Sequence, residues 1–417
     1  MNYQKIASCR LCGNSNLESV LDLGPQKLTG VFPRSVEDDL ISGPLELVRC
    51  VPHGEVCCGL LQLLHSYPQA AMYGENYGYR SGLNASMVRH LKRKTENLLN
   101  LVNPSKGSLL VDIGSNDGTL LNSYPEHFRR AGIDPVAKKF LSFYNPSVQI
   151  VPDFFSAETW QRNLGQVKAS VITSVAMFYD LERPLEFVEE IAAHLAPEGV
   201  WHFEQSYMPL MLNNMAYDTI CHEHIEYYAL RQIHWALRRC GLKIIALEPS
   251  NVNGGSLAVT AAAQNSRYPE ATGMVKSLLD HEQSQGLEEM EPFFEFRDKV
   301  FRHRDALKSE VKRLQDSGLK ILGYGASTKG NVILQFCEFG KEDLAMIGEV
   351  NPDKFGALTP GTHIPIVSEE VMHHEKPDVL MVLPWHFRQS IVEREHHFIQ
   401  RGGRLLFPLP QIELFPS

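Results

Sequence analysis

The chain has 417 residues, which is long for one compact domain and favours two to four domains of about 150 residues each. Hydrophobic residues make up 43% and charged residues 21%, and 40 Lys and Arg against 49 Asp and Glu give a formal net charge of −9. This acidic balance argues against a dedicated nucleic-acid binder. Without an apolar run of about 18 residues or a signal-peptide core, the sequence predicts a cytoplasmic protein with no membrane partner.

The first 58 residues hold five of the eight cysteines. In a reducing compartment, cysteines are thiols or metal ligands before they are disulfides. A C-x-x-C knuckle is followed, after a strand-like run, by a second cysteine pair, and four such thiolates predict a tetrahedral zinc site. The site would be structural, because four thiolates leave no open position, and residues 1–65 would form a small zinc-binding domain. The expected ligands are Cys9, Cys12, Cys50 and Cys58, with Cys57 or His53 as alternatives.

Residues 66–262 are predicted to form an α/β domain. A segment rich in Tyr, Gly and Asn, residues 73–82, leads into a helix expected over Asn84–Asn100. Apolar strands then alternate with helices, which implies a parallel sheet covered on both faces. The expected strands are Gly107–Ile113, Ala131–Asp134, Val148–Val151, Ala169–Val175, Gly199–Gln205 and Lys243–Glu248, and the clearest helices are Thr119–Ser123 and Glu186–Ala196.

Residues 263–417 are predicted to form a helical connector and a second, Rossmann-like α/β domain. The connector, up to about residue 318, is charged and mostly helical. The first strand after it ends in a glycine turn, as in nucleotide-binding sheets. The expected strands are Leu319–Gly325, Leu344–Val350, Val379–Leu383 and Arg404–Phe407.

The first α/β domain carries a candidate cofactor loop at residues 111–119. Its acidic turn would repel a dinucleotide pyrophosphate, but it would attract the ammonium and sulfonium of S-adenosylmethionine (SAM). Asp134 ends the second strand, where a carboxylate can bind both ribose hydroxyls, and Asp153 and Phe154 follow the third strand, where an adenine would lie. This is the layout of class I SAM methyltransferases. The candidate SAM-binding residues are Asp112, Gly114, Asn116, Asp117, Gly118, Asp134, Asp153 and Phe154.

A polar segment, residues 217–228, follows the fifth strand of this domain. His222 and His224 flank Glu223, but i, i+2 spacing is not the i, i+4 spacing of a helical zinc pair. We therefore predict an acid–base site, in which Glu223 orients an imidazole or accepts a substrate hydroxyl. The polar turn at residues 251–256 either lines the same cleft or is only a hairpin turn.

A second glycine-rich loop, residues 323–331, opens a helix in the C-terminal domain. Its hydroxyls, its helix N-terminus and Lys329 suit a diphosphate, whereas the pattern is not that of a P-loop for ATP hydrolysis. The ends of the following strands offer groups for a base or ribose, although Trp385 is also explained by ordinary packing. The candidate substrate-binding residues are Tyr207, Asn253, Ser327, Thr328, Lys329, Asn331, Glu349, Trp385 and His386.

The order of motifs is specific. It runs C-R-x-C, Y-G-Y-R-S-G, V-D-I-G-S-N-D-G, E-Q-S-Y, D-T-I-C-H-E-H, N-G-G-S and G-Y-G-A-S-T-K-G-N. Over nearly its full length the chain resembles the three-domain sugar C-methyltransferases of bacterial deoxysugar pathways. The resemblance implies a zinc-binding domain, a SAM domain and a C-terminal Rossmann-like domain. It also implies methylation at C3 of a nucleotide-linked 4-keto-6-deoxyhexose.

Carried over by residue, the resemblance makes His224 the base and Glu223 a sugar-contacting carboxylate, with tyrosines closing over the sugar. The chain departs from the better-known members at Cys221, where they carry a Tyr whose hydroxyl assists at the ketone. Tyr179, Tyr207 or a water would then take that role. The candidate catalytic residues are His224, Glu223, Tyr77, Tyr79, Cys221 and His222.

The expected reaction begins with removal of the C3 proton by the base. The resulting enolate needs nearby donors and then attacks the SAM methyl group, while the remote diphosphate orients the sugar. The nucleotide, TDP or GDP, stays open, and we expect a monomer. The alternatives are an O- or N-methyltransferase acting on a sugar or small molecule, a non-catalytic SAM- or nucleotide-binding regulator, and an NAD-dependent sugar dehydrogenase or epimerase.

Overall fold

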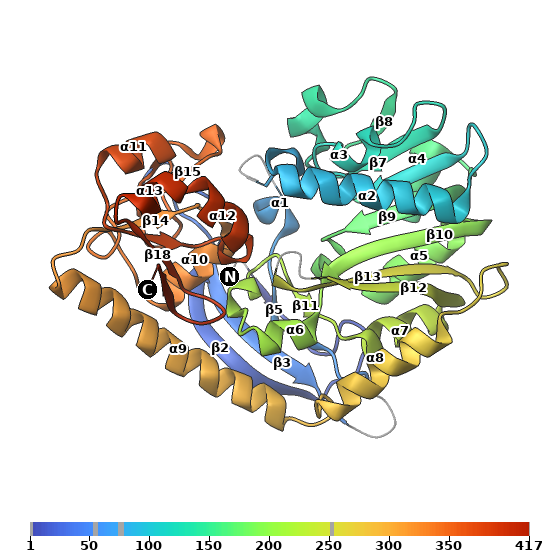
Figure 1. Cartoon of the computed structure of the whole chain (residues 1–417). Coiled ribbons are helices and arrows are strands. Elements are labelled where there is room, and N and C mark those ends of the chain that lie inside the picture. The colour runs from blue at the N-terminus through green and yellow to red at the C-terminus, as the bar shows by residue number, and fades with distance from the viewer. Residues whose placement is uncertain (1–2, 53–56, 74–78, 251–253, 417) are drawn as a thin grey trace.

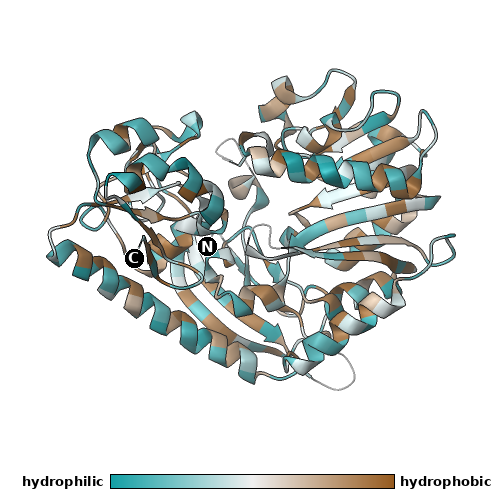
Figure 2. Cartoon of the chain, in the orientation of Figure 1, coloured by the Kyte–Doolittle hydropathy of each residue, from teal (hydrophilic) through white to brown (hydrophobic). Residues whose placement is uncertain are grey.

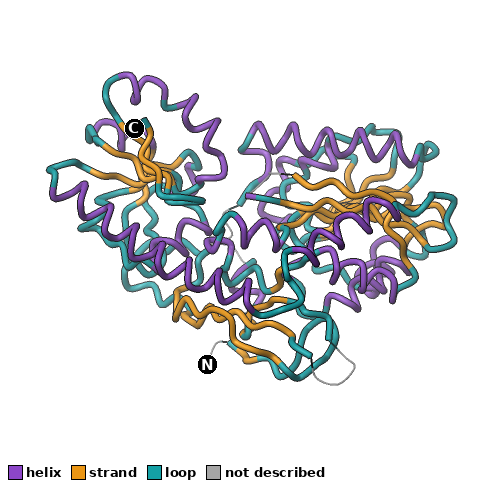
Figure 3. Tube along the Cα trace, turned by 60° about the horizontal axis from the view of Figure 1, so that its bottom comes forward, coloured by secondary structure: helices purple, strands orange, loops and turns teal. Residues whose placement is uncertain are grey.

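The computed structural model describes residues 3–52, 57–73, 79–250 and 254–416. Within these residues the strands form four sheets, of two, seven, four and six strands. The seven-stranded and six-stranded sheets lie in two lobes, and the curved strands β2 and β3 run beneath the space between them (Figure 1). Figure 3, in which the bottom of Figure 1 comes forward, shows the N-terminal strands at the bottom of the view, below the two lobes. No helix among the described residues is long and apolar enough to cross a membrane.

The N-terminal strands are antiparallel and stand in the order β11-β4-β3-β2, with β1 and β5 paired separately. The edge strand β11 comes from the predicted catalytic segment, so this sheet includes residues of the middle of the chain. The predicted boundary between residues 65 and 66 stays a prediction; it lies between the two residues of β5. The bounds are β1 Gln4–Lys5, β2 Leu17–Lys27, β3 Ser42–Cys50, β4 Leu61–Leu63, β5 His65–Ser66 and β11 Glu226–Tyr227.

The seven-stranded sheet has the order β12-β13-β10-β9-β6-β7-β8. The prediction of a wholly parallel sheet is wrong at one edge, because β13 is antiparallel to both β10 and β12. Only five residues of the sequence separate β12 from β13, too few for the crossover that a parallel pair of strands needs. The bounds are β6 Leu109–Ile113, β7 Arg129–Ile133, β8 Val148–Val151, β9 Ala169–Val175, β10 Leu195–Ser206, β12 Leu242–Ser250 and β13 Ser256–Ala263.

Helices cover the seven-stranded sheet, and α2 packs on β9 and β10. This helix forms where the sequence predicts it, because the Asn84 side chain caps its first turn and Met87, Leu91 and Leu98 recur on its buried face. The helical bounds are α1 Gln69–Met72, α2 Ala85–Val102, α3 Thr119–Asn122, α4 Ala157–Leu164, α5 Pro184–His194, α6 Met208–Asn213 and α7 Leu230–Arg239.

The connector is a pair of helices, α8 Thr272–Ser284 and α9 Glu291–Asp316, that runs below both lobes (Figure 1). Figure 2 shows apolar and polar residues alternating along α9, and its apolar stripe includes the buried Phe293, Val300 and Leu307. Apolar residues that recur every third or fourth position therefore form one face, which packs this helix against strands β2 and β14.

The C-terminal sheet has the order β16-β15-β14-β17-β18-β19, and only β19 is antiparallel to its neighbour among the described strands. The sequence predicts its four central parallel strands but not the short edge strands β16 and β19. The bounds are β14 Ile321–Tyr324, β15 Ile347–Glu349, β16 Ile366–Ser368, β17 Val379–Val382, β18 Arg404–Phe407, β19 Glu413–Phe415, α10 Thr328–Phe336, α11 Glu369–His374, α12 Arg388–Arg394 and α13 His396–Gln400.

Candidate functional site

The four predicted zinc ligands come together. Their Sγ atoms all lie within 4.8 Å of one another, with Cys9 and Cys58 at 3.5 Å and Cys12 and Cys50 at 3.6 Å. Zn–S bonds of about 2.3 Å in a tetrahedron place sulfurs about 3.8 Å apart, so these thiols fit a zinc ion. Cys57 points its thiol to the Cys50 carbonyl instead, and His53 lies outside the described residues.

The cofactor loop lies at the carboxyl edge of the seven-stranded sheet, where β6, β7 and β8 end side by side. Gly114 and Gly118 have φ of +74° and +75°, which L side chains rarely adopt, and they turn the chain from β6 into α3. Burial raises the pKa of Asp112 to about 7, and its carboxylate accepts a hydrogen bond from Thr173 at 2.5 Å. The edge is therefore acidic and dry.

Asp134, just after β7, is held by two backbone hydrogen bonds. Its two carboxylate oxygens accept the backbone N–H groups of Asn116 at 2.7 Å and Val136 at 2.8 Å. Each oxygen keeps a second lone pair, so the side chain is held in place and can still accept two hydroxyl groups. Burial raises its pKa, and the two backbone hydrogen bonds lower it.

Two other predicted SAM-binding residues, Asn116 and Asp117, form hydrogen bonds with the backbone of residues 79–82. The Asn116 side chain donates to the Tyr79 carbonyl at 3.1 Å and accepts the Ser81 N–H at 2.9 Å. Asp117 accepts the Gly82 N–H at 2.8 Å. These bonds anchor the end of the tyrosine-rich segment on the cofactor loop, which the sequence did not predict. The side chain of Tyr79 itself is half exposed, and Tyr77 lies outside the described residues.

The last two predicted SAM residues lie at the rim of the same edge. Asp153 forms an ion pair with Arg162 at 2.6 Å, and Phe154 is 42% exposed. Stacking of an adenine on Phe154 stays a prediction.

His224 is the most clearly oriented residue of the predicted catalytic segment. Its Nδ1 lies 3.0 Å from the carbonyl of Thr219, at the end of the turn η4 (Tyr217–Thr219), and the Tyr179 ring meets it edge-on with centroids 4.5 Å apart. A carbonyl only accepts, so Nδ1 carries the proton and the lone pair is on Nε2. Burial and the charge of Lys329 lower the pKa of His224 to about 3, so the ring is neutral near pH 7.

Two buried acids, Glu223 and Asp180, lie near Cys221 in the same part of the structure. Burial raises the pKa of Glu223, which a hydrogen bond from the Cys221 thiol lowers in part, and burial also raises the pKa of Asp180. Among the described residues, the buried Glu223 Oε2 has no hydrogen-bond partner, whereas a hydrogen bond from Tyr73 lowers the pKa of Asp180 in part. A buried oxygen without a partner can accept a hydrogen bond from a ligand. Cys221 is fully buried, and burial raises its pKa.

The structure separates His222 from His224. His222 faces the N-terminal strands, with its Nδ1 3.5 Å from the Thr29 hydroxyl and its ring edge-on to Tyr67 at 4.6 Å. It is fully buried, and burial lowers its pKa to about 4. In an extended segment residues i and i+2 would face the same side, but His222 and Glu223 form a turn, across which the His224 N–H donates to the Cys221 carbonyl at 3.1 Å. Because of this turn, His222 packs against the N-terminal strands and shares none of these contacts with His224.

The C-terminal loop approaches the same segment. Burial raises the pKa of Asp218, and the charge of Lys329 and the hydrogen bond that Trp385 Nε1 donates at 2.8 Å lower it in part. Lys329 also lowers the pKa of His224. Burial and Lys329 also lower the pKa of His386. Ser327 caps α10 by accepting the Gly330 N–H at 3.0 Å. A Cβ added to Gly30 would lie 3.5 Å from the Thr328 hydroxyl and 2.0 Å from Glu223 Oε1, so three parts of the chain meet here.

Three predicted substrate residues make hydrogen bonds within the protein, and their contact with a substrate stays a prediction. Tyr207 donates its hydroxyl to Glu282 of α8 at 2.5 Å, so it faces the connector. Asn331 donates to the Thr29 carbonyl at 2.7 Å and is fully buried. Glu349 turns back to accept the N–H groups of the next two residues. Asn253 lies outside the described residues.

Sequence reasoning missed Lys354, which follows β15. Its ammonium donates to the Ala326 carbonyl in the glycine-rich loop at 2.8 Å, and it lies 4.5 Å from the centroid of the Phe32 ring. Burial lowers its pKa, Glu349 raises it, and Lys139 of the SAM domain lowers it. The signal for it was weak, because a lysine four residues after a predicted strand is normally a surface residue.

Three sequence families match successive parts of the chain. They are described as "Putative zinc binding domain" at residues 9–73, "Methyltransferase domain" at residues 84–247 and "C-methyltransferase C-terminal domain" at residues 251–410. Together with the cofactor edge and the four-cysteine cluster, these matches define the class of the protein. The chain is a SAM-dependent C-methyltransferase with a class I methyltransferase fold and a zinc-binding N-terminal domain.

Among curated proteins, the chain is similar to the C-methyltransferase NovU of Streptomyces niveus. The two are 29% identical over 415 residues, which cover 97% of this chain and 96% of the relative. A solved SAM-dependent methyltransferase from Clostridium acetobutylicum is 13% identical and covers 42% of this chain and 92% of its own, with a TM-score of 0.33. The complex of the Haloferax volcanii Trm112 activator with a methyltransferase gives 16% identity, coverage of 44% and 94%, and a TM-score of 0.36.

Proposed function

We propose that this enzyme methylates C3 of a nucleotide-linked 4-keto-6-deoxyhexose, with His224 as the base. The observation that carries the proposal is the fixed tautomer of His224, whose Nδ1 is held by the Thr219 carbonyl while Lys329 of the C-terminal loop lies close enough to lower its pKa. A neutral imidazole with a free Nε2 can take a proton from carbon. A cation beside it can hold a phosphate.

The position of Lys329 gives the base a means of activation. A histidine whose pKa is about 3 is always deprotonated near pH 7, but it is a weak base. A bound diphosphate would neutralise the charge of Lys329, and the pKa of His224 would rise. The base therefore becomes stronger when the sugar nucleotide is in place, and free enzyme is less reactive toward other carbon acids.

The proton and the developing charge then have defined places. The C3 proton moves to Nε2 of His224, and the electrons of the C–H bond pass into the enolate of the 4-ketone. The enolate oxygen needs a donor. The Tyr207 hydroxyl donates its hydrogen bond to Glu282. We therefore assign the role of enolate donor to Tyr179, whose ring contacts His224. Bound SAM supplies an electrophilic methyl group to the enolate carbon.

The diphosphate is assigned to the glycine-rich loop of the C-terminal domain. The first turn of α10, which has nine residues, offers N–H groups and the hydroxyl of Thr328. Lys329, in the first turn of α10, and Lys354, whose ammonium donates to the Ala326 carbonyl, add positive charge at the loop. The name of the relative NovU, a C-methyltransferase, agrees with transfer to carbon.

The test is incubation with SAM and TDP- or GDP-linked 4-keto-6-deoxyhexoses in deuterium oxide, followed by mass spectrometry. The proposal expects a gain of one methyl group and enzyme-dependent deuterium in unreacted sugar. His224→Asn should abolish both signals and leave SAM binding by calorimetry unchanged. Methylation without exchange would point to an O- or N-methyltransferase, and near wild-type turnover of His224→Asn would remove the base from the proposal.

A further inference from the structure

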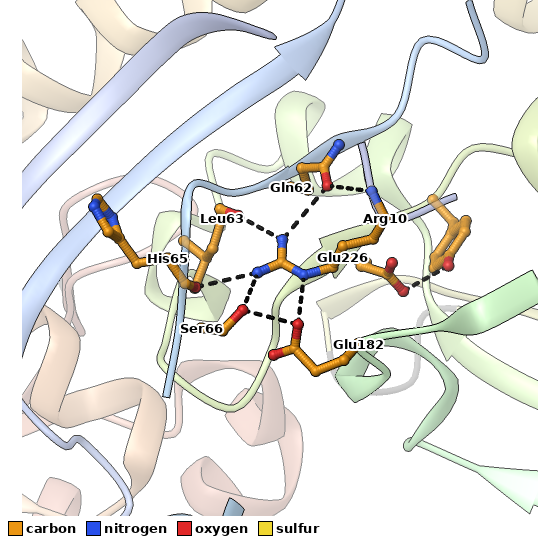
Figure 4. A network of polar contacts seen from close by, with 8 residues as sticks. Arg10, Gln62, Leu63, His65, Ser66, Glu182 and Glu226 are labelled. Atoms are coloured by element: carbon orange, nitrogen blue, oxygen red, sulfur yellow. Dashed lines mark hydrogen bonds and ion pairs between the residues drawn. The ribbon is translucent and has the colours of Figure 1, made fainter. Parts of the chain in front are cut away.

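Arg10 lies inside the zinc knuckle, between Cys9 and Cys12, yet its side chain is only 2% exposed (Figure 4). The guanidinium is surrounded by acceptors that belong to distant parts of the sequence. It donates to Leu63 O at 2.6 Å, Ser66 Oγ at 2.8 Å, Glu182 Oε2 at 3.2 Å, His65 O at 3.3 Å and Gln62 Oε1 at 3.4 Å. A planar fork with five donors satisfies this set, and a lysine ammonium does not.

These acceptors come from two units. Leu63 and Ser66 belong to β4 and β5 of the N-terminal strands, whereas Glu182 follows the turn η3 (Phe178–Asp180) at the end of β9. Ser66 donates its own hydroxyl to Glu182 at 2.8 Å, so the three side chains close a ring of contacts (Figure 4). Arg10 thus ties the zinc knuckle to the turn that leaves the central strand of the SAM domain.

The same two elements hold the residue after His224. The N–H of Ile225 donates to the Tyr179 carbonyl at 3.0 Å, and the Leu63 N–H donates to the Ile225 carbonyl at 2.9 Å. The Tyr179 ring also contacts the His224 ring. Residues 178–182 and strand β4 therefore clamp the backbone at Ile225 from both sides, and Arg10 joins the two halves of the clamp.

Glu226 completes this connection. It pairs with Gln62 across β11 and β4, and Tyr228 donates to it at 2.6 Å. Burial raises the pKa of Glu226, and the charge of Arg10 lowers it. The guanidinium thus lies close to the residue two positions beyond His224 as well as to the clamp.

We propose that Arg10 is a positioning residue for methyl transfer, which joins β4 to the 178–182 turn and so fixes where His224 presents Nε2. The role of His224 rests on the proposed function above. Through Arg10, the zinc-binding domain would affect the rate of the reaction, although the four cysteine thiols of this domain face one another rather than the substrate. An Arg10 variant changes the geometry of the base without changing any group that contacts SAM or the diphosphate.

The test compares Arg10→Lys with Arg49→Lys in the full-length zinc-loaded chain. Arg49 is a matched control, because it is also buried and next to a zinc ligand, but it donates to Leu287 O and Glu288 O of the connector. We expect kcat of Arg10→Lys to fall about 10- to 100-fold, as for a misplaced catalytic group, with both KM values within about threefold of wild type. Arg49→Lys should keep its kcat, and both variants should retain zinc by elemental analysis.

A second readout needs no substrate. In ¹⁵N-histidine NMR spectra, His224, assigned with His224→Asn, should show the Nδ1–H tautomer in the wild type and in Arg49→Lys, and lose or broaden it in Arg10→Lys. If Arg10→Lys does not fold, Glu182→Gln, which keeps an acceptor oxygen, should give a smaller change in the same direction. An unchanged His224 signal and kcat, or an equal loss in Arg49→Lys, would overturn the proposal. A changed His224 signal without turnover on any 4-keto sugar would reject the proposed substrate and keep the positioning role.

Discussion

Glu204, in the E-Q-S-Y motif, provides a sharp test of how the SAM domain is held together. The Glu204 carboxylate lies in a buried cluster. It accepts a hydrogen bond from His90 Nε2 at 2.8 Å and lies 3.0 Å from the Lys94 ammonium, and both of these residues belong to α2. Lys94 also reaches the half-exposed Glu248 at 3.2 Å. The cluster clamps α2 on β10, and α2 starts at the segment anchored on the cofactor loop. Glu204→Gln should loosen that clamp.

The pKa of Glu204 gives the size of the effect. Burial raises this pKa, but the hydrogen bond from His90 and the charges of Lys94 and His90 lower it from 4.5 to about 2. This difference corresponds to about 3 kcal/mol of stability at pH 7. Removing one member of a buried ion pair costs about 3–5 kcal/mol, so the two routes agree. The stabilisation is complete above the unfolded-state pKa and disappears as the pH falls through about 2.

Hydrogen exchange with mass spectrometry measures the loss locally, which suits a chain of several domains. At pH 7, peptides from α2 and β10 should lose about 100-fold of their protection in Glu204→Gln, and at pH 3 the difference should shrink to about 1 kcal/mol. Glu248→Gln is the matched control, because an exposed pair contributes about 1 kcal/mol or less. Protection of Glu204→Gln within about threefold of the wild type, or equal to that of Glu248→Gln, would refute the reasoning.

Three further predictions concern the metal, the diphosphate and the enolate. Cys12→Ser should lose zinc by elemental analysis and expose the N-terminal strands to limited proteolysis, since a structural site contributes folding energy; full zinc occupancy in this variant would contradict the four-thiolate assignment. Lys354→Met should raise the KM for the sugar nucleotide about 10-fold and leave the Kd for SAM unchanged, because its ammonium lies on the Ala326 carbonyl of the loop; a weaker SAM Kd would place it elsewhere. Tyr179→Phe should lower kcat about 100-fold if its hydroxyl serves the enolate, whereas Tyr207→Phe, which faces Glu282, should alter thermal stability and spare kcat.

The sequence predicts the central strands well because their chemistry is local. Strands β8, β9 and β18 occupy the expected ranges, since short, mostly apolar runs between turn residues favour strands over helices. The direction of β13 could not be read in the same way. Its residues are as apolar as those of its neighbours, and its reversal depends on the short connection from β12 and on the pairing that this connection allows.

The candidate site residues also differ in whether a local motif or a contact between domains positions them. Cys9, Cys12, Cys50 and Cys58 form a motif that carries its own geometry, and the structure brings their sulfurs together. Arg10 lies inside that motif, yet nothing in the sequence says that its side chain reaches a turn 172 residues away. Such a contact depends on how domains dock, and an isolated sequence pattern holds no information on docking.

The docking of domains also explains the character of the catalytic segment. Residues 217–228 have only one short strand, β11, and that strand pairs with β4 of another domain. Asp218 is held by Trp385 of the C-terminal domain, and His222 is buried against Thr29 of the N-terminal strands. The fixed position of His224 is therefore a property of three docked domains rather than of its own loop. Substitutions at these distant contacts should change kcat before they change the affinity for either substrate, because they shift the base and leave the binding groups in place.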